Sequence, residues 1–138
     1  MAAGGLVIGF GVAKIKEVDE SGWRALVAAF DMHGEPVDAL GPEDLLGHDH
    51  DEGELTIIYD AAASPRGTIA LTLKRIGASD RVVLLRVAGE SLEALASHEA
   101  VSVGAVAWLG EDLLAAGINS KGIVVYRVEG EASRRWRG

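Results

Sequence analysis

The fold is decided by the segment Thr68-Ile69-Ala70-Leu71-Thr72-Leu73, in which a large apolar side chain occupies every second position. Successive side chains of a β-strand point to opposite faces of the sheet, so this pattern predicts a strand. We expect Ile69, Leu71 and Leu73 to face the core, and Thr72 and Lys74 to face solvent. A slip of one residue would expose the whole apolar set, so the sequence specifies this orientation strongly.

Further apolar runs have the length and composition of strands. Leu55–Tyr59 is rich in β-branched and aromatic residues, which favour the pleated conformation. Arg24–Phe30 fits a strand or a helix by its periodicity, and a segment with the composition of a turn, Asp31–Gly34, follows it. Many of the 18 glycines lie between the runs, as tight turns require. The other predicted strands are Leu6–Val12, Arg81–Val87, Val101–Leu109 and Ile123–Val128.

Helix signals are few. Ser91–Ser97 begins with a residue that caps helices and continues with good helix formers, which predicts one or two turns. Pro42–Leu46 has proline at the first helical position and predicts one more turn. The sequence therefore predicts an all-β protein, an antiparallel β-sandwich or small barrel with at most one or two short helices. We expect residues 1–138 to form a single β-rich domain.

Two segments resemble each other, Arg81–Ser91 (RVVLLRVAGES) and Gly122–Ala132 (GIVVYRVEGEA). A repeat at this spacing is typical of propeller blades, but the chain is long enough for only about three blades and a closed propeller needs at least four. We therefore interpret the similarity as two hairpins of the same kind.

Composition excludes several classes of protein. The chain has no cysteine, which rules out disulfides, thiolate metal sites and cysteine nucleophiles. No apolar run approaches the roughly 20 residues of a membrane span, and the first ten residues have no basic stretch of the kind that begins a signal peptide. We expect a cytoplasmic protein that does not bind membranes.

The negative charge is concentrated in one third of the chain. Lys and Arg number 13 and Asp and Glu 21, which gives a net charge of −8. The 41 residues between Arg24 and Arg66 hold ten Asp and Glu and no Lys or Arg, and the rest of the chain has a net charge of +2. Such a face repels phosphates, so nucleic acid is not an expected partner. The stretch is interpreted either as a solvated acidic loop or as a divalent-cation site.

The densest group of possible ligands lies within this stretch. It consists of His48, Asp49, His50, Asp51, Glu52 and Glu54. Carboxylate oxygens are the ligands that calcium prefers, so an irregular calcium site is one interpretation. An EF-hand is excluded because a predicted strand occupies the second half of the loop. A hairpin tip that binds no metal is another interpretation.

A transition-metal site is the third interpretation. His48, His50 and Glu54 have the spacing of the first metal motif of cupins, which are small β-barrels, and on a strand all three share one face. His98 would have to be the remaining histidine. Ser102 stands where that family has asparagine, and its second motif, rich in glycine and proline, is missing. We otherwise expect His33 and His98 to be surface histidines.

The sequence contains no recognisable catalytic motif. It has no phosphate-binding P-loop and no nucleophile elbow of the Gly-x-Ser-x-Gly type. Gly9-Phe10-Gly11 is followed by Lys14 at the position where a dinucleotide-binding motif has its third glycine. We therefore expect a binding protein in preference to an enzyme and predict no catalytic residue.

Parts of the sequence, within about residues 25–128, resemble the tellurium-resistance TerD family. Ile58-Tyr59-Asp60 and Ala63-Ser64-Pro65-Arg66-Gly67-Thr68-Ile69 are similar to a Phe-Tyr-Asn…Ser-Pro-Asp-Gly-Ser-Val stretch of that family. The resemblance implies a β-sandwich, often calcium-binding, with a role in tellurite resistance and stress responses of bacteria. The acidic ligand loop of the family would follow Ile69 and is missing here, so no family ligand is carried over.

Three functions are compatible with the sequence. The first is a non-enzymatic β-sandwich module that binds calcium, or another divalent cation, or a protein partner through its acidic face. The second is a cupin-like enzyme with a transition metal held by His48, His50 and Glu54. The third is a protein interaction or oligomerisation domain built on the apolar strands, with another protein or a second copy as its partner.

Overall fold

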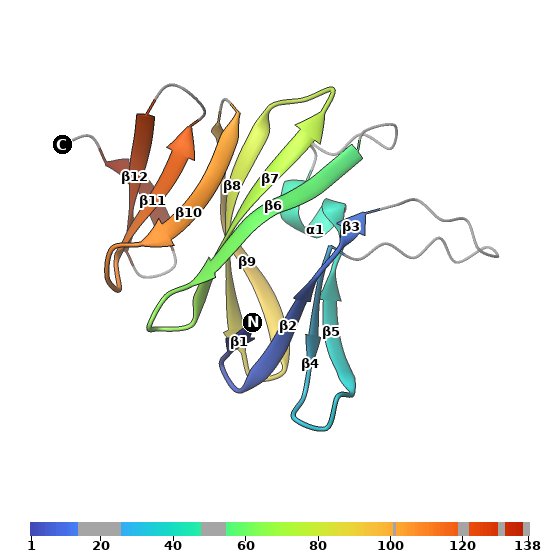
Figure 1. Ribbon diagram of the computed structural model, residues 1–138. Helices are drawn as coiled ribbons and strands as arrows, with labels where there is room; N and C mark the ends of the chain where they lie inside the picture. Colours follow the sequence, from blue (N-terminus) through green and yellow to red (C-terminus); the bar gives the residue numbers. More distant parts are fainter. Residues whose placement is uncertain (14–25, 48–54, 101, 119–121, 130–131, 137–138) are drawn as a thin grey trace.

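The computed structural model describes residues 1–13, 26–47, 55–100, 102–118, 122–129 and 132–136. They form an all-β, sandwich-like fold with three antiparallel sheets and one short helix, α1 (Pro42–Leu46) (Figure 1). Sheet A has the strand order β1 (Ala2–Ala3), β2 (Leu6–Phe10), β4 (Val27–Phe30) and β5 (Pro36–Leu40). Sheet B has the order β3 (Val12–Ala13), β6 (Leu55–Ala63), β7 (Thr68–Ile76), β8 (Asp80–Ala88) and β9 (Ser91–Ala100). Sheet C has the order β10 (Val103–Trp108), β11 (Leu113–Ile118), β12 (Gly122–Glu129) and β13 (Ala132–Trp136).

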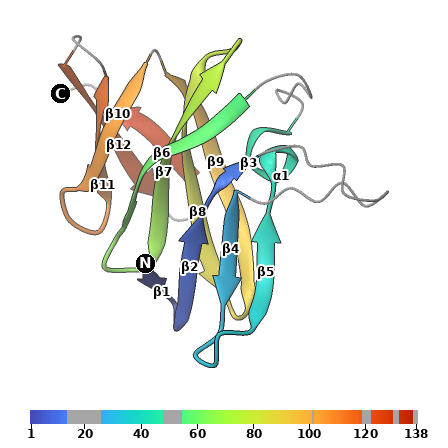
Figure 2. The same ribbon diagram turned by 45° about the vertical axis from the view of Figure 1, so that its right-hand side comes forward.

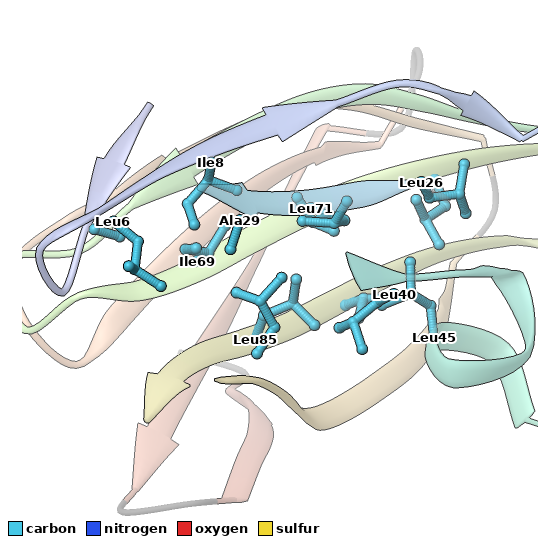
Figure 3. Close-up of a cluster of buried hydrophobic side chains, with 14 of the residues drawn as sticks. Leu6, Ile8, Leu26, Ala29, Leu40, Leu45, Ile69, Leu71 and Leu85 are labelled. Atoms are coloured by element: carbon cyan, nitrogen blue, oxygen red, sulfur yellow. The ribbon is translucent and has the colours of Figure 1, made fainter. Parts of the chain in front are cut away.

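Sheet B is the middle layer, with sheet A on one face and sheet C on the other (Figures 1 and 2). Alternate residues of β7 and β8 supply the two cores. Ile69 and Leu71 enter the core shared with sheet A, where they pack near Leu6, Ile8 and Ala29 (Figure 3). Ala70 and Leu84 enter the core shared with sheet C. Each face of the middle sheet therefore packs on a different outer sheet.

Packing on both faces of sheet B corrects one prediction about β7. Ile69, Leu71 and Leu73 are buried as expected, but Thr72 is fully buried as well, so the expectation that it faces solvent is wrong. Sheet C covers the face on which Thr72 lies, since β10 packs across β6 and β7. Lys74, further along the same face, is partly exposed and forms an ion pair with Asp80 at 3.5 Å.

Sheets A and B are joined at their edges. β2 belongs to sheet A and β3 to sheet B, with Gly11 alone between them, so one nearly continuous strand passes from one layer to the next. The Gly11 N–H donates to the Leu26 carbonyl at 2.9 Å, which holds the chain at this corner. Strands that switch sheets in this way form the corners of many sandwiches.

The helix at Pro42–Leu46 forms as predicted. Gly41 is its N-cap, and the Asp44 carboxylate accepts the Gly41 N–H at 2.8 Å. Leu45 and Leu46 are buried in the core between sheets A and B. The helix therefore covers one end of that core. Within the described part of the chain, no helix has the length and apolar character that crossing a bilayer requires.

The other predicted helix is wrong. Residues 91–97 belong to β9, which pairs with β8 along its whole length. Leu92 is buried in the core, and Glu93 accepts a hydrogen bond from Arg86 of β8 at 2.7 Å. Pairing with a neighbouring strand and burial of Leu92 outweigh the modest helix preference of this sequence.

The two similar segments form two hairpins, as interpreted. Arg81–Ser91 belongs to the β8–β9 hairpin of sheet B, and Gly122–Ala132 belongs to the β12–β13 hairpin of sheet C. Because the hairpins lie in different sheets, their likeness reflects a common local structure.

Candidate functional site

The predicted metal-binding cluster lies outside the described residues. His48, Asp49, His50, Asp51, Glu52 and Glu54 all fall between the end of α1 and the start of β6. Among the described residues, no group of three or more histidines and carboxylates is placed to hold a metal ion. The calcium site and the cupin-like transition-metal site therefore stay predictions from the sequence.

Two acids of the charged stretch that the structure describes, Asp31 and Asp44, serve local structure. In the β4–β5 turn, one Asp31 oxygen accepts the N–H groups of His33 and Glu35 at 2.8 and 3.0 Å. Asp44 accepts a hydrogen bond at the start of α1. These carboxylates satisfy backbone donors that turns and helix ends leave without partners.

Three aspartates connect one sheet to another. On β5, the Asp38 carboxylate accepts the Leu92 N–H of β9 at 2.6 Å, which links sheets A and B. On β6, Asp60 accepts the N–H of Val106 in β10 at 3.0 Å. On β8, Asp80 accepts the N–H of Val103, also in β10, at 2.9 Å. Each of the three also accepts a second N–H from its own sheet. The three carboxylates therefore fix how the layers dock.

His98 is placed between two sheets. It lies on β9, and its ring stands 5.3 Å from that of Tyr126 on β12, measured between centroids. Burial lowers the pKa of His98 below its usual value, and the positive charge of Arg81 lowers it further. His33 is exposed in a turn, as predicted. His98 was also expected at the surface, but it is partly buried against sheet C.

The outer face of sheet C, which points away from sheet B, is the most unusual surface of the described chain. Its side chains alternate along β10–β12 with the buried ones, and nearly all of them are apolar. Ile123 is 72% exposed and Leu109 59% exposed. Arg127 and, at the end of β12, Glu129 are the charged residues that alternate onto this face. The face consists of Ala107, Leu109, Leu113, Ala115, Gly117, Ile123, Val125 and Arg127, with Glu129 next in register along β12.

A sheet with one face in water normally carries polar residues on that face. A large exposed apolar surface is informative in a way that single exposed apolar residues are not. Ala107, Ala115 and Val125 lie side by side on three neighbouring strands, so the surface is continuous across the sheet. Such a surface has the character of a contact surface for protein.

Sheet A has a smaller outer face of the same kind. It consists of Val7 and Gly9 on β2, Ala28 and Phe30 on β4, and Ala39 on β5. Val7 is 45% exposed. Phe30 lies over Gly9, where a Cβ atom would stand 3.6 Å from the Phe30 ring. Small side chains therefore make up most of this face, around one aromatic ring.

A third exposed apolar group lies on sheet B. Tyr59 is 56% exposed and Ile76 66% exposed. The Lys74 ammonium lies 5.2 Å from the centre of the Tyr59 ring and forms the ion pair with Asp80. A charged side chain thus covers part of this group.

Comparison with protein-family models, with curated proteins and with solved structures gives no match to this chain. The resemblance to the TerD family, with the calcium binding and stress-related role that it implies, therefore stays a prediction from the sequence. The fold and the outer faces of the sheets are the observations on which a function can be argued.

Proposed function

We propose that this chain is a non-enzymatic module that associates with protein through the outer face of sheet C. The observation that carries the proposal is the exposure of Ile123 and Leu109 on a face whose other residues are small or apolar until Arg127 and Glu129 at the end of β12. Covering this face would remove apolar surface from water, which stabilises a complex by roughly 25 cal/mol for each Å² that is buried.

The partner chemistry follows from the surface. The charged residues of the face, Arg127 and Glu129, lie together at the end of β12, and the rest of the face is uncharged. An apolar surface would therefore fit it. A second copy of the chain offers such a surface, so self-association is the form of the proposal that we test.

The test compares two isoleucines that are about equally exposed. Ile123→Glu places a charge on the outer face of sheet C, whereas Ile76→Glu places the same charge on sheet B, away from that face. We expect the average mass of the wild type in sedimentation equilibrium to rise with protein concentration. Ile123→Glu should abolish the rise, and Ile76→Glu should leave it unchanged.

Two results would overturn the proposal. A wild type that stays monomeric up to millimolar concentration would show that the chain does not associate with itself. Association that survives Ile123→Glu but is lost in Ile76→Glu would assign the contact to sheet B. Urea unfolding of each variant shows whether the fold is retained.

Divalent-cation binding by Asp49, Asp51, Glu52 and Glu54 is a second candidate, favoured by the stretch from Ala25 to Pro65 that holds acids and no Lys or Arg. Calcium that binds the folded chain at ten times its Kd would raise stability by about 1.4 kcal/mol. We expect millimolar calcium to raise the melting temperature more than sodium at equal ionic strength.

The double variant His48→Ala, His50→Ala separates calcium from a transition metal. A carboxylate site for calcium should survive this change, whereas a cupin-like site should lose its metal. A melting temperature that responds neither to calcium nor to a chelator would contradict the cation site.

A further inference from the structure

We propose that sheet C exchanges between two copies of the chain, so that sheet C of each copy packs on sheet B of the other in a domain-swapped dimer. The contact surface in this inference is the inner face of sheet C, whereas the proposed function uses its outer face. The two proposals are therefore independent, and each can fail without the other.

Sheet C is a separate unit along the chain. Its four strands, β10 to β13, follow one another between Val103 and Trp136, and the chain passes from sheet B to sheet C between Ala100 and Val103. Among the described residues, the core between sheets A and B contains none from sheet C. Sheet C could therefore leave its own copy without breaking that core.

The connection between sheets B and C is short and strained. Ser102 has a φ of 53°, and it is the one described residue other than glycine with a positive φ. This conformation is disfavoured because the Cβ atom comes too close to the following carbonyl oxygen. An extended connection would relieve the strain and carry β10 away from its own copy. Short hinges under strain favour this kind of exchange.

The contacts between sheets B and C can also form between copies. The core between them combines apolar side chains of both sheets. The Trp108 indole N–H donates to the Ala62 carbonyl at 3.0 Å, and Arg66 forms an ion pair with Glu111 at 3.1 Å. Each contact joins a residue before the connection to one after it, so exchange preserves it. The assembly closes at two copies because each copy gives and receives one sheet.

The burial between the two sheets predicts slow exchange. Sheet C must leave sheet B before it can pack on another copy, and this step exposes Leu84 and Leu114, which are almost fully buried. Association through an outer face needs no such opening. We therefore expect the swapped dimer to form during refolding at high protein concentration and to persist after dilution.

The first experiment varies the connection. Wild type, Ser102→Gly and Ser102→Pro are unfolded in urea, refolded at high protein concentration, diluted and separated by size exclusion. Glycine relieves the strain of the closed connection in both copies, so we expect at least about tenfold less dimer than in the wild type. Proline fixes φ at about −65° and cannot adopt the closed conformation, so we expect the dimer to predominate.

Gly77→Ser is the control for strain outside the connection. Gly77 has a φ of 95° in the turn between β7 and β8, and a Cβ atom there would meet no described atom within 4 Å. The variant therefore places a strained serine inside sheet B. It should form as much dimer as the wild type, because this turn does not join two layers.

The second experiment tests which copy supplies sheet C. The chain has no cysteine, so Arg66→Cys is introduced in one chain and Glu111→Cys in another. The ion pair of these residues is exposed and contributes little to stability, so both variants should fold. After the two are refolded together, a short bis-maleimide should join them, because residue 66 of one copy faces residue 111 of the other. Chains refolded separately and then mixed should not be joined.

Ile123→Glu separates this inference from the proposed function. Ile123 lies outside the core between sheets B and C, so the persistent dimer should form in this variant as well. Loss of the dimer in Ile123→Glu, or a dimer that the bis-maleimide does not join, would overturn the exchange and leave the proposed function standing. A wild type that refolds entirely to monomer would also overturn the exchange. If Ser102→Pro does not fold, the wild type, Ser102→Gly and the cross-link decide the question.

Discussion

β7 and β12 look alike in sequence, but their surroundings differ. Both are runs of apolar residues with few charges, yet β7 lies in the middle sheet with both faces covered, and β12 lies in an outer sheet with one face exposed. Thr72 on β7 is fully buried, whereas Ile123 on β12 is 72% exposed. An apolar run therefore shows that a strand is present, and the layers around it decide how many of its faces are buried.

The largest expected effect compares the same kind of truncation in the two strands. Leu71→Ala removes a fully buried side chain from the core between sheets A and B and should cost about 2–5 kcal/mol in the free energy of unfolding. Ile123→Ala, at low protein concentration, should cost less than about 1 kcal/mol because Ile123 is mostly in water. Urea unfolding measures both. Equal costs would show that β12 is covered in solution.

A smaller effect is expected where the middle sheet meets sheet C. The two Asp60 oxygens accept the N–H groups of Ala61 and Val106. Asp60→Asn leaves one oxygen acceptor and places a side-chain NH₂ group opposite one of the two backbone N–H groups. We therefore expect the free energy of unfolding to fall by about 1–3 kcal/mol.

Asp31→Asn is the control for this prediction. A single Asp31 oxygen accepts both of its N–H groups, and an asparagine oxygen can do the same. We expect the free energy of unfolding, measured with urea, to change by less than about 0.5 kcal/mol. If the two variants were equally stable, the Asp60 carboxylate would not be what joins the sheets.

The smallest expected effect is a change in pH dependence at the same boundary. The pKa of His98 in the folded chain is lowered, first by burial and then by Arg81, whereas in the unfolded chain it is near 6.5. Below about pH 6.5 the unfolded chain binds a proton that folded His98 resists, so stability falls as the pH falls. Above that pH both states are neutral and the contribution vanishes.

His98→Gln should therefore flatten the decrease in urea midpoint between pH 7.5 and pH 5.5, and His33→Gln, in an exposed turn, should not. A decrease of the same size in both variants would assign the pH dependence to other groups. The comparison tests whether the packing of His98 on Tyr126 has an energetic consequence.

Much of the strand content follows from the sequence, and the exceptions have physical causes. Leu55–Tyr59 and Thr68–Leu73 form strands as predicted because branched and alternating apolar residues are direct local signals. β9 and β11 were not predicted as strands. Ser91–Ser97 and Leu113–Gly117 are rich in Leu, Ala or Gly, so pairing with neighbouring strands decides their conformation.

The site was less predictable than the fold. The local charge predicted a metal site at His48–Glu54, which lies outside the described residues. The outer face of sheet C carries no charge or motif until Arg127, and Val125 looks like a core residue when read along the chain. The packing of sheet C on sheet B identifies this face, because Val124 and Tyr126 point into the core between the two sheets and leave Val125 and Ile123 outside.

The order of the layers along the chain has a consequence for synthesis. Sheet A is complete at Leu40, but its inner face packs on β7, β8 and β9, which end about 60 residues later. A ribosome adds roughly 5–20 residues each second, so sheet A waits about 3–12 s for the strands that cover it. During that interval the nascent chain presents an apolar segment that cannot yet be buried as in the native fold. A chaperone that shields apolar segments would have its natural target there.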